Sequence, residues 1–304
     1  MDHINECITA LREAAPEIDI LLNEPMRRHT TFAIGGPADL FVQPKTRREL
    51  AETLRVFRER GVRFLLLGNG SNMLVADAGI RGAVVCTSEL DDVRVNDDGT
   101  LVAEAGALLG RVARRAQRAG LTGVEFAGGI PGSLGGAVFM NAGAYDGQMA
   151  GVVVQTEYLD ENGALHTLTG DEHNFGYRRS VFRDHPDWTV VRSTLRLQPG
   201  DPAAILDYMN DLAQRRREKQ PLNFPSAGST FKRPAGYFAG KLIEDAGLKG
   251  TSVGGAQVSE KHAGFLINRG GATCDDMLRL IELVQQRVKE KFGVQLECEV
   301  RIIR

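Results

Sequence analysis

Two glycine-rich loops are the parts of this 304-residue chain with the clearest chemical use. They are Gly68-Asn-Gly-Ser-Asn72 and Gly128-Gly-Ile-Pro-Gly-Ser-Leu-Gly-Gly136. Glycine permits positive φ and a close approach of backbone to ligand, and concave arrays of backbone N–H groups bind anions. Glycine accounts for 35 of the 304 residues, a larger share than the usual value of about 7%. Either loop alone could be an ordinary tight turn, but together they predict a cradle for the pyrophosphate of a large cofactor.

Neither loop fits the common nucleotide-binding motifs. A P-loop ends in Gly-Lys-Ser/Thr, and neither loop has a lysine at that place. A Rossmann fingerprint needs a third glycine three residues after the second, at the start of a helix. That position is Met73, and the segment from Met73 to Asp77 has the pattern of extended chain. The loops therefore predict a phosphate cradle of another kind.

Three polar segments could act on a substrate. In 175–182, arginines stand among aromatic and apolar residues and could clamp a carboxylate, although a surface salt bridge would explain them as well. In 226–234, the adjacent hydroxyl pair Ser229-Thr230 and two cations could hold a phosphate or donate a proton, or form a plain loop. In 296–300, alternation places Glu297 and Glu299 on one strand face. Two buried carboxylates would need a partner or a role, whereas a solvent-facing edge strand would need neither.

Other chemistries have little support in the sequence. The six histidines show no HxxxH spacing, so we predict no metal site. No Gly-x-Ser-x-Gly motif is present for an acyl-transfer serine. The run Arg215–Lys219 is typical of the solvated face of a helix. The four cysteines are scattered without CxxC spacing, which predicts reduced thiols.

Capping signals and periodicity place the first loop between regular elements. Thr46-Arg-Arg-Glu49 is a capping box that predicts a helix ending at Gly61. Arg63–Leu67 has the pattern of a buried strand that leads directly into the first loop. Ala83–Thr87 and Leu101–Ala105 are predicted strands before the second loop. The apolar positions between 108 and 116 predict a helix that ends at Gly120.

The pattern changes after the second loop. Val152–Asp160 and Ala164–Thr169 flank Asn162-Gly163, which predicts a β-hairpin, and Thr189–Leu197 predicts another strand. A domain boundary is predicted near 199–202, followed by a charged helix through Lys219. The predictions for the C-terminal part are a helix from the box Thr273-Cys-Asp-Asp276 to Gly293, and a final strand Gln295–Ile303. The fold class is therefore mixed α and β, with a cofactor part at roughly 20–198 and a C-terminal part at 200–304.

Composition limits the possible partners and location. A formal charge of −2 gives no electrostatic reason to expect nucleic acid or a bilayer. The N-terminal residues lack the basic and apolar regions of a signal peptide. No apolar stretch reaches the roughly 18 residues that a membrane span needs. We therefore expect a cytoplasmic protein.

Six sequence blocks follow one another along the chain. They are Thr30-Thr-Phe-Ala-Ile-Gly-Gly-Pro-Ala-Asp39, Leu67-Gly-Asn-Gly-Ser-Asn72, Gly128-Gly-Ile-Pro-Gly-Ser-Leu-Gly-Gly-Ala137, Tyr177-Arg178, Gly228-Ser-Thr-Phe-Lys232 and Leu296-Glu-Cys-Glu-Val-Arg301. Together they closely resemble the UDP-N-acetylenolpyruvoylglucosamine reductase family, flavoenzymes of bacterial cell-wall precursor synthesis. Six ordered blocks from about residue 20 to the last residue make the resemblance far more specific than any single loop.

The resemblance implies an α+β fold with an FAD-binding domain of the vanillyl-alcohol-oxidase (PCMH) type. Its two subdomains are expected at 1–95 and 96–198, and a C-terminal substrate-binding domain at 199–304. FAD is expected to bind without a covalent link, with NADPH as co-substrate. The expected partner is a small nucleotide sugar, with no nucleic acid, membrane span or protein partner.

The implied reaction is a ping-pong reduction. NADPH gives hydride to FAD, and reduced FAD passes hydride to C3 of the enolpyruvyl ether on UDP-N-acetylglucosamine. Protonation at C2 then leaves the lactyl ether of UDP-N-acetylmuramate. Because the alkene is electron-rich, its carboxylate must be drawn into an aci-enolate-like intermediate.

Motif positions carry the family's roles onto this chain. Ser229 is implied as the proton donor to C2, and Arg178 and Glu299 as groups that stabilise the carboxylate and its developing charge. The weaker candidates for contacts with the nucleotide sugar are Tyr177, Lys232 and Arg233. We also expect the ammonium of Lys232 to stabilise the serine alkoxide. The expected FAD contacts are Gly68, Asn69, Gly70, Ser71, Asn72, Gly128, Gly132, Ser133, Gly135, Gly136 and Ala137.

The chain departs from the family pattern in three places. Arg233 stands where some relatives carry asparagine, and Cys298 replaces a common proline between the two glutamates. The short span from Tyr177 to Pro199 places the chain in the branch without the extra tyrosine-bearing loop that covers the substrate in longer relatives.

Two other functions remain open on the sequence. One is a sugar or lactone oxidase of the same superfamily, although the histidine that often carries a covalent flavin near the first loop is absent. The other is a non-catalytic module that binds nucleotide sugars.

Overall fold

The computed structural model describes residues 2–304, which form two compact units. Unit 1 contains residues up to Leu21 together with Leu40–Asn69 and Gly82–Gln214. Unit 2 contains Leu22–Asp39, Gly70–Arg81 and Arg215–Arg304. Neither unit is one continuous stretch of chain, so the expected ranges 1–95, 96–198 and 199–304 stay predictions.

A four-stranded sheet holds the first glycine loop at the end of one strand. Its order is β1-β2-β5-β3, with bounds Asp19–Pro25, Pro37–Gln43, Ile80–Cys86 and Phe64–Leu67. The strand predicted before the loop is therefore present as β3, parallel to β5, but only Leu67 of it is buried. The prediction of a buried strand was wrong because β3 is an edge strand of this sheet.

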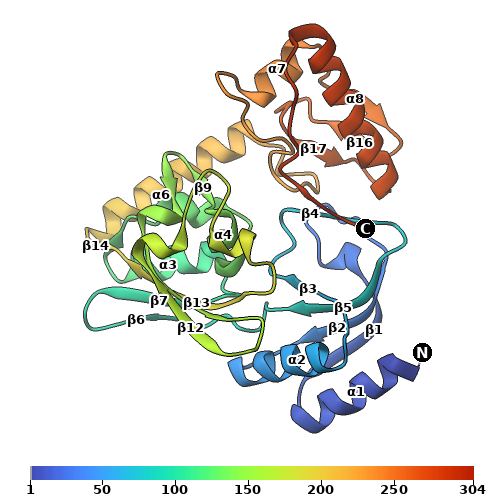
Figure 1. Ribbon diagram of the computed structural model, residues 1–304. Coiled ribbons are helices and arrows are strands. Elements are labelled where there is room, and N and C mark those ends of the chain that lie inside the picture. Colours follow the sequence, from blue (N-terminus) through green and yellow to red (C-terminus); the bar gives the residue numbers. More distant parts are fainter. Residues whose placement is uncertain (1) are drawn as a thin grey trace. The chain divides into compact units, whose positions relative to one another are not determined.

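Two helices of unit 1 share an apolar core and lie next to one another, α1 (Asp2–Ala14) and α2 (Arg47–Glu59) (Figure 1). The predicted start of α2 is confirmed, since the Thr46 hydroxyl accepts the Glu49 N–H at 3.1 Å. Gly61 follows the helix with φ +62°, as expected for a residue that ends it. Burial of one face, including Leu54 and Phe57, stabilises α2 against the core.

A five-stranded antiparallel sheet forms the other half of unit 1. Its order is β12-β11-β13-β7-β6, with bounds Leu165–Thr169, Val153–Leu159, Thr189–Arg196, Thr100–Glu104 and Val93–Val95. The predicted hairpin is confirmed, because Leu159 pairs with Leu165 and the Asp160 carboxylate accepts the N–H groups of Asn162 and Ala164. Helices α3 (Leu109–Arg118) and α4 (Leu134–Met140) bury their apolar faces in the same core as this sheet.

Several short elements and one long helix lie elsewhere along the chain. They are β8 (Leu121–Thr122), β9 (Gly143–Ala144), β10 (Gly147–Gln148), α5 (Val181–Asp184), β14 (Gln198–Pro199), α6 (Pro202–Lys219) and the 3-10 helices Met26–Arg28, Glu125–Gly129, Met149–Gly151 and Gly170–His173. The charged helix predicted through Lys219 is thus confirmed as α6.

Unit 2 contains a small sheet, two helices and a strand pair. The sheet β15-β16-β17 (Ser252–Val253, Ala256–Val258, Leu266–Asn268) shares a core with α7 (Ala239–Asp245) and α8 (Cys274–Phe292) (Figure 1). The predicted capping box of α8 is present between Thr273 and Asp276, and Gly293 ends the helix at φ +69°. Asp77 also caps the start of α8, because its carboxylate accepts the N–H groups of Cys274 and Asp275 at 2.9 and 3.2 Å.

The predicted final strand Gln295–Ile303 is wrong in its extent. Only β18 (Arg301–Ile303) is a strand, and it pairs in parallel with β4 (Met73–Val75). Residues 295–300 instead make isolated contacts with the segment 229–232, which is too short and irregular to form a ladder. Among residues 2–304, no helix has both the length and the apolar character that a membrane span requires.

Candidate active site

The two glycine loops meet inside unit 1. The Asn69 side-chain amide donates to the Pro131 carbonyl at 2.7 Å. A Cβ at Gly68 would overlap Ser133 Oγ, so a larger residue there would require the Ser133 side chain to move. The loops predicted to share a ligand are therefore in contact through Gly68–Asn69 and 131–133.

The hydroxyl of Ser133 is an unusual feature of this contact. Its Oγ is buried and has no hydrogen-bond partner within residues 2–304. Ser133 precedes α4 with extended backbone, but its side chain does not cap the helix. A buried hydroxyl without a partner carries a desolvation cost, which a ligand with acceptor oxygens would remove.

The glycines at the start of α4 have different uses. The N–H groups of Leu134 and Gly135 both donate at 2.8 Å, to the carbonyls of Ala107 and Ala105. A Cβ at Gly135 would also lie 3.0 Å from that of Ala105. Gly135 therefore allows α4 to pack against the segment 105–107, and its N–H already donates to the Ala105 carbonyl. Gly128, Gly132, Gly136 and Ala137 lie along the same loop and helix.

The rest of the first loop belongs to unit 2. Gly70 has φ +57°, and a Cβ there would lie 1.9 Å from the His29 carbonyl oxygen. Ser71 follows it and is half-buried. The Asn72 side-chain amide donates to the Glu299 carbonyl at 3.3 Å, and the Asn72 carbonyl accepts the Arg301 N–H at 3.0 Å. The loop residues and the C-terminal segment are thus joined within unit 2.

Arg178 lies in a tight turn of unit 1 with an uncommon backbone. The N–H and carbonyl of Gly176 bond those of Arg179 at 2.9 and 3.2 Å, which closes the turn. Arg178 has φ +55°, in the left-handed region where glycine is usual. Its guanidinium lies 5.4 Å from the ring centroid of Tyr177, whose side chain is 59% exposed. Strained backbone that persists at such a residue is typical of functional sites.

The turn is anchored to the C-terminal end of α4. The Asn141 amide donates to the Gly176 carbonyl at 3.0 Å, and its oxygen accepts the Ala150 N–H at 2.9 Å. The hydroxyl of Ser180 donates to the Phe139 carbonyl at 2.9 Å. One seven-residue helix therefore has the glycine loop at its start and the Arg178 turn at its end. Asn141 was not among the predicted site residues, although an asparagine after a helix is a typical C-cap signal.

Ser229 lies on an extended segment of unit 2 with neighbours on both sides. It bridges Phe265, and the next residue, Thr230, donates its N–H to the Gly264 carbonyl at 2.9 Å. On the other side the Thr230 carbonyl accepts the Glu299 N–H at 2.8 Å. Thr230 is fully buried, and its hydroxyl accepts the Leu266 N–H at 3.2 Å. The backbone beside Ser229 is therefore firmly held, while the Ser229 side chain is exposed.

The same segment brings Lys232 against the two glutamates. The Lys232 N–H donates to the Glu297 carbonyl at 2.8 Å, and the ammonium forms an ion pair with the Glu297 carboxylate. Glu297 is exposed and Glu299 is half-buried, whereas Leu296 and Val300 are in the core. The prediction that the glutamates share a face is confirmed, although the segment is not a regular strand.

His262 is a further polar side chain beside the Ser229 segment that the sequence analysis did not single out. Its Nδ1 accepts the Gly264 N–H at 3.1 Å, so the neutral ring carries its proton on Nε2. Burial lowers the pKa of His262 below its ordinary value. Burial likewise raises the pKa of the nearby Cys298 thiol, and all four cysteines are free. His262 lies in no motif spacing that would have drawn attention to it.

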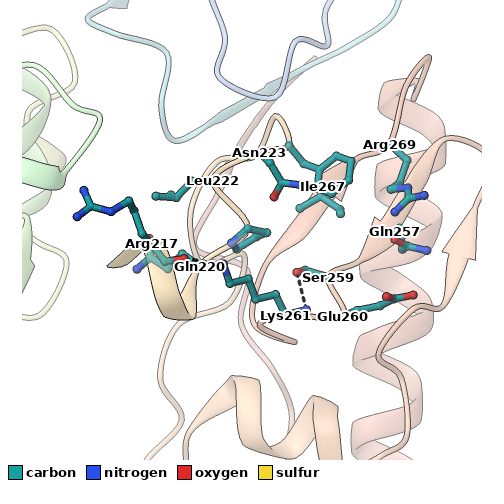
Figure 2. A pocket seen from close by; sticks show the side chains of 12 residues that line it. Arg217, Gln220, Leu222, Asn223, Gln257, Ser259, Glu260, Lys261, Ile267 and Arg269 are labelled. Atoms are coloured by element: carbon teal, nitrogen blue, oxygen red, sulfur yellow. Dashed lines mark hydrogen bonds between the residues drawn. The ribbon is translucent and has the colours of Figure 1, made fainter. Parts of the chain in front are cut away.

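A separate hollow of about 530 Å³ also lies in unit 2 (Figure 2). Gln257 and Ile267 line it from β16 and β17, and Gln220 and Leu222 line it from the segment after α6. The Lys261 N–H donates to the Ser259 hydroxyl at its rim. None of the site residues predicted from the sequence lines this hollow.

Family models match both parts of the chain. The C-terminal domain of UDP-N-acetylenolpyruvoylglucosamine reductase matches residues 220–303, and an FAD binding domain matches residues 38–169. These ranges contain the Ser229 segment and the two glycine loops.

Relatives match over nearly the whole chain. A UDP-N-acetylenolpyruvoylglucosamine reductase from Caldanaerobacter subterraneus subsp. tengcongensis is 53% identical over 97% of this chain and 97% of its own length. The enzyme of the same name from Clostridium perfringens is 50% identical over 100% and 99%. The crystal structure of the Thermus caldophilus enzyme has a TM-score of 0.79 and 35% identity, and covers 95% of this chain and 99% of that one.

The expected α+β class, the FAD-binding domain and the reductase activity in peptidoglycan precursor synthesis are therefore confirmed. The oxidase and the non-catalytic module are set aside, because relatives that match end to end are named as the reductase. The chain belongs to the UDP-N-acetylenolpyruvoylglucosamine reductase family, as an FAD-dependent oxidoreductase of peptidoglycan precursor synthesis.

Proposed function

We propose that this protein uses NADPH to reduce the enolpyruvyl ether of UDP-N-acetylglucosamine enolpyruvate, and that Ser229 protonates C2 of the intermediate formed when hydride adds to C3. The observation that carries the proposal is the Ser229 segment. It is bonded on one side to Gly264 and on the other to Glu299, and it presents an exposed hydroxyl. A proton donor, a carboxyl group and an ammonium group are thus close together along one short stretch of unit 2.

The residues of unit 1 fit an FAD site by their own chemistry. The buried Ser133 hydroxyl lacks a hydrogen-bond partner within residues 2–304, and Gly68 places no side chain against it. We propose that Gly68, Asn69, Ser133 and the Gly136 N–H hold the pyrophosphate, since the other first-turn N–H groups of α4 are already used. When bound, FAD supplies the hydride-transfer chemistry that no side chain can provide.

Arg178 and Glu299 are proposed to act on the substrate carboxylate. A guanidinium can bind a carboxylate through two parallel hydrogen bonds and neutralise its charge. This makes addition of hydride to the electron-rich alkene easier, because negative charge moves onto the carboxylate as the new bond forms. A protonated Glu299 would donate a hydrogen bond to the same oxygen atoms.

Ser229 needs help to act as an acid, because an isolated serine hydroxyl gives up its proton poorly. The positive charge of Lys232 is proposed to stabilise the alkoxide left after the proton moves to C2. Glu297 is part of this arrangement, since its carboxylate already pairs with the ammonium group. Replacing Lys232 with Met should therefore slow reoxidation of bound FAD by the enolpyruvyl substrate more than its reduction by NADPH, and equal slowing of both would contradict the idea.

The decisive test is anaerobic stopped-flow spectroscopy of bound FAD in the wild type and in Ser229→Ala. The enolpyruvyl substrate should reoxidise the wild type rapidly and Ser229→Ala at least 100-fold more slowly, a loss on the order of that expected for general acid catalysis. Ser226→Ala, in the same turn, is the matched control and should behave as the wild type. Rapid reoxidation of Ser229→Ala would remove Ser229 from the role.

The expected cytoplasmic location and the two-subdomain division of the FAD-binding part also remain proposals. Both are supported by the family resemblance, in which the substrate is a nucleotide sugar used for precursor synthesis.

A further inference from the structure

Arg233 stacks on an aromatic ring that the sequence analysis did not consider. Its guanidinium carbon lies 3.9 Å from the centroid of the Phe238 ring. Phe238 is 61% exposed, which is unusual for a phenylalanine, so the guanidinium covers one of the larger apolar surfaces of unit 2. Distances this short are typical of face-to-face cation–π stacking.

The local backbone holds both partners of this pair. Pro234 follows Arg233 directly and restricts it to extended conformations. The Tyr237 N–H donates to the Pro234 carbonyl at 3.1 Å, which closes a turn that returns the chain toward Arg233.

Phe238 in turn is fixed at the start of α7. Its carbonyl accepts the Leu242 N–H at 3.1 Å. Ala239, Leu242 and Ile243 of α7 are buried in the core shared with α8. The ring therefore belongs to a packed part of unit 2, although its surface is exposed.

Stacking determines what the guanidinium can bind. When one face lies on a ring, the N–H donors remain at the edge of the plane, in the fork that matches two phosphate oxygens. An arginine held in this way loses less conformational entropy on binding than a mobile one. Lys232, the residue before it, has its ammonium paired with Glu297, so it competes less for the same anion.

We propose that Phe238 is a positioning residue, which holds the Arg233 guanidinium by stacking so that it clamps the diphosphate of the nucleotide sugar. The inference rests on the proposed function, because the nucleotide sugar supplies the diphosphate. It gives a role to the arginine that replaces the asparagine of some relatives. Phe238 is not a catalytic residue, since it acts only through Arg233.

The test measures binding of UDP to the FAD-loaded protein by isothermal titration calorimetry. Arg233→Gln should weaken UDP binding about tenfold or more, as expected for a charge-assisted bidentate contact. Phe238→Leu keeps the apolar bulk but removes the aromatic face, and should weaken binding about two- to fivefold. Phe238→Tyr keeps the face and should restore wild-type affinity.

Two comparisons separate positioning from a general structural effect. Phe238→Leu should have no further effect when added to Arg233→Gln, because the stacked cation is already gone. Tyr237→Leu removes the adjacent exposed aromatic side chain and should leave UDP affinity unchanged. Equal weakening by Phe238→Leu with and without Arg233 would overturn the proposal, as would wild-type affinity in Arg233→Gln. Failure of the wild type to bind UDP would instead contradict the proposed substrate.

Discussion

Replacing Arg178 with glycine should separate the strain in its backbone from the function of its side chain. Arg178 adopts φ +55° at a turn position that favours glycine. A left-handed conformation costs a non-glycine residue roughly 1–2 kcal/mol. Glycine avoids this cost but loses roughly 0.5–1 kcal/mol through the greater freedom of its unfolded chain. Arg178→Gly should therefore be more stable than Arg178→Ala by about 1 kcal/mol.

The two variants should nevertheless lose activity equally. Both lack the guanidinium proposed to bind the substrate carboxylate, and removal of one such group from a preorganised site costs about 100-fold in kcat. Consumption of NADPH in the presence of the enolpyruvyl substrate measures the activity, and urea unfolding measures the stability. Bound FAD must be at the same saturation in all variants, because ligands add to apparent stability.

Arg179→Gly is the matched control, because Arg179 lies in the same turn without a positive φ. It should lose stability rather than gain it, and it should keep most of the activity. Equal stability of Arg178→Gly and Arg178→Ala would refute the argument from backbone strain. Near-normal activity in Arg178→Gly would refute the proposed role of the side chain while leaving the strain argument intact.

Three further outcomes follow from contacts within single units. Asp77→Ala should lower the free energy of unfolding by about 1 kcal/mol in urea titrations, because two N–H groups at the start of α8 lose their acceptor. Asp275→Ala removes a first-turn carboxylate without this role and should lower the free energy of unfolding by less. His173 is buried, and burial lowers its pKa below the ordinary histidine value of 6.5, so the unfolded state binds its proton more readily and stability should fall as the pH drops below about 6.5. His173→Phe should lack this part of the pH dependence in unfolding measured from pH 7 downward, even if it is less stable throughout. Burial raises the pKa of Cys274 to about 11, so it should resist alkylation of the native protein at pH 8, and rapid labelling of this thiol would contradict its position in the core.

Local signals predicted much of the fold. The Thr46 and Thr273 boxes each begin a helix, Asn162-Gly163 lies between two paired strands, and Gly61 and Gly293 follow helix ends. In each case the residues that carry the signal are neighbours in the sequence, so the information is present in a short stretch of chain. Helix α1 was missed, although Ile4, Cys7 and Leu11 carry helical spacing and Cys7 and Leu11 are fully buried.

Features that depend on distant parts of the chain were not predictable in this way. The final strand was expected to be long, but its pairing is decided by residues 73–75 and 229–232. The turn in which Arg178 has its positive φ is bonded to Asn141, 37 positions earlier in the chain, at the end of α4.

The candidate site was predictable only in part for the same reason. The contact of Gly68 with Ser133 agrees with two loops that share a ligand, but the orphaned hydroxyl could not be read from the sequence. The stacking of Arg233 on Phe238 likewise depends on a turn whose closure no motif indicates.

The parallel pairing of β4 with β18 has a consequence for how the protein is made. About 230 residues separate the two strands, so at typical translation rates roughly 10–50 s pass between synthesis of the first and the second. During that time the segments 22–39 and 70–81 have left the ribosome without the partners that bury them in unit 2. Nascent chains should therefore expose these segments to chaperones and proteases until the partner residues 215–304 emerge. Cell extracts should consequently contain few intermediates that end between β4 and β18, because quality control removes them first.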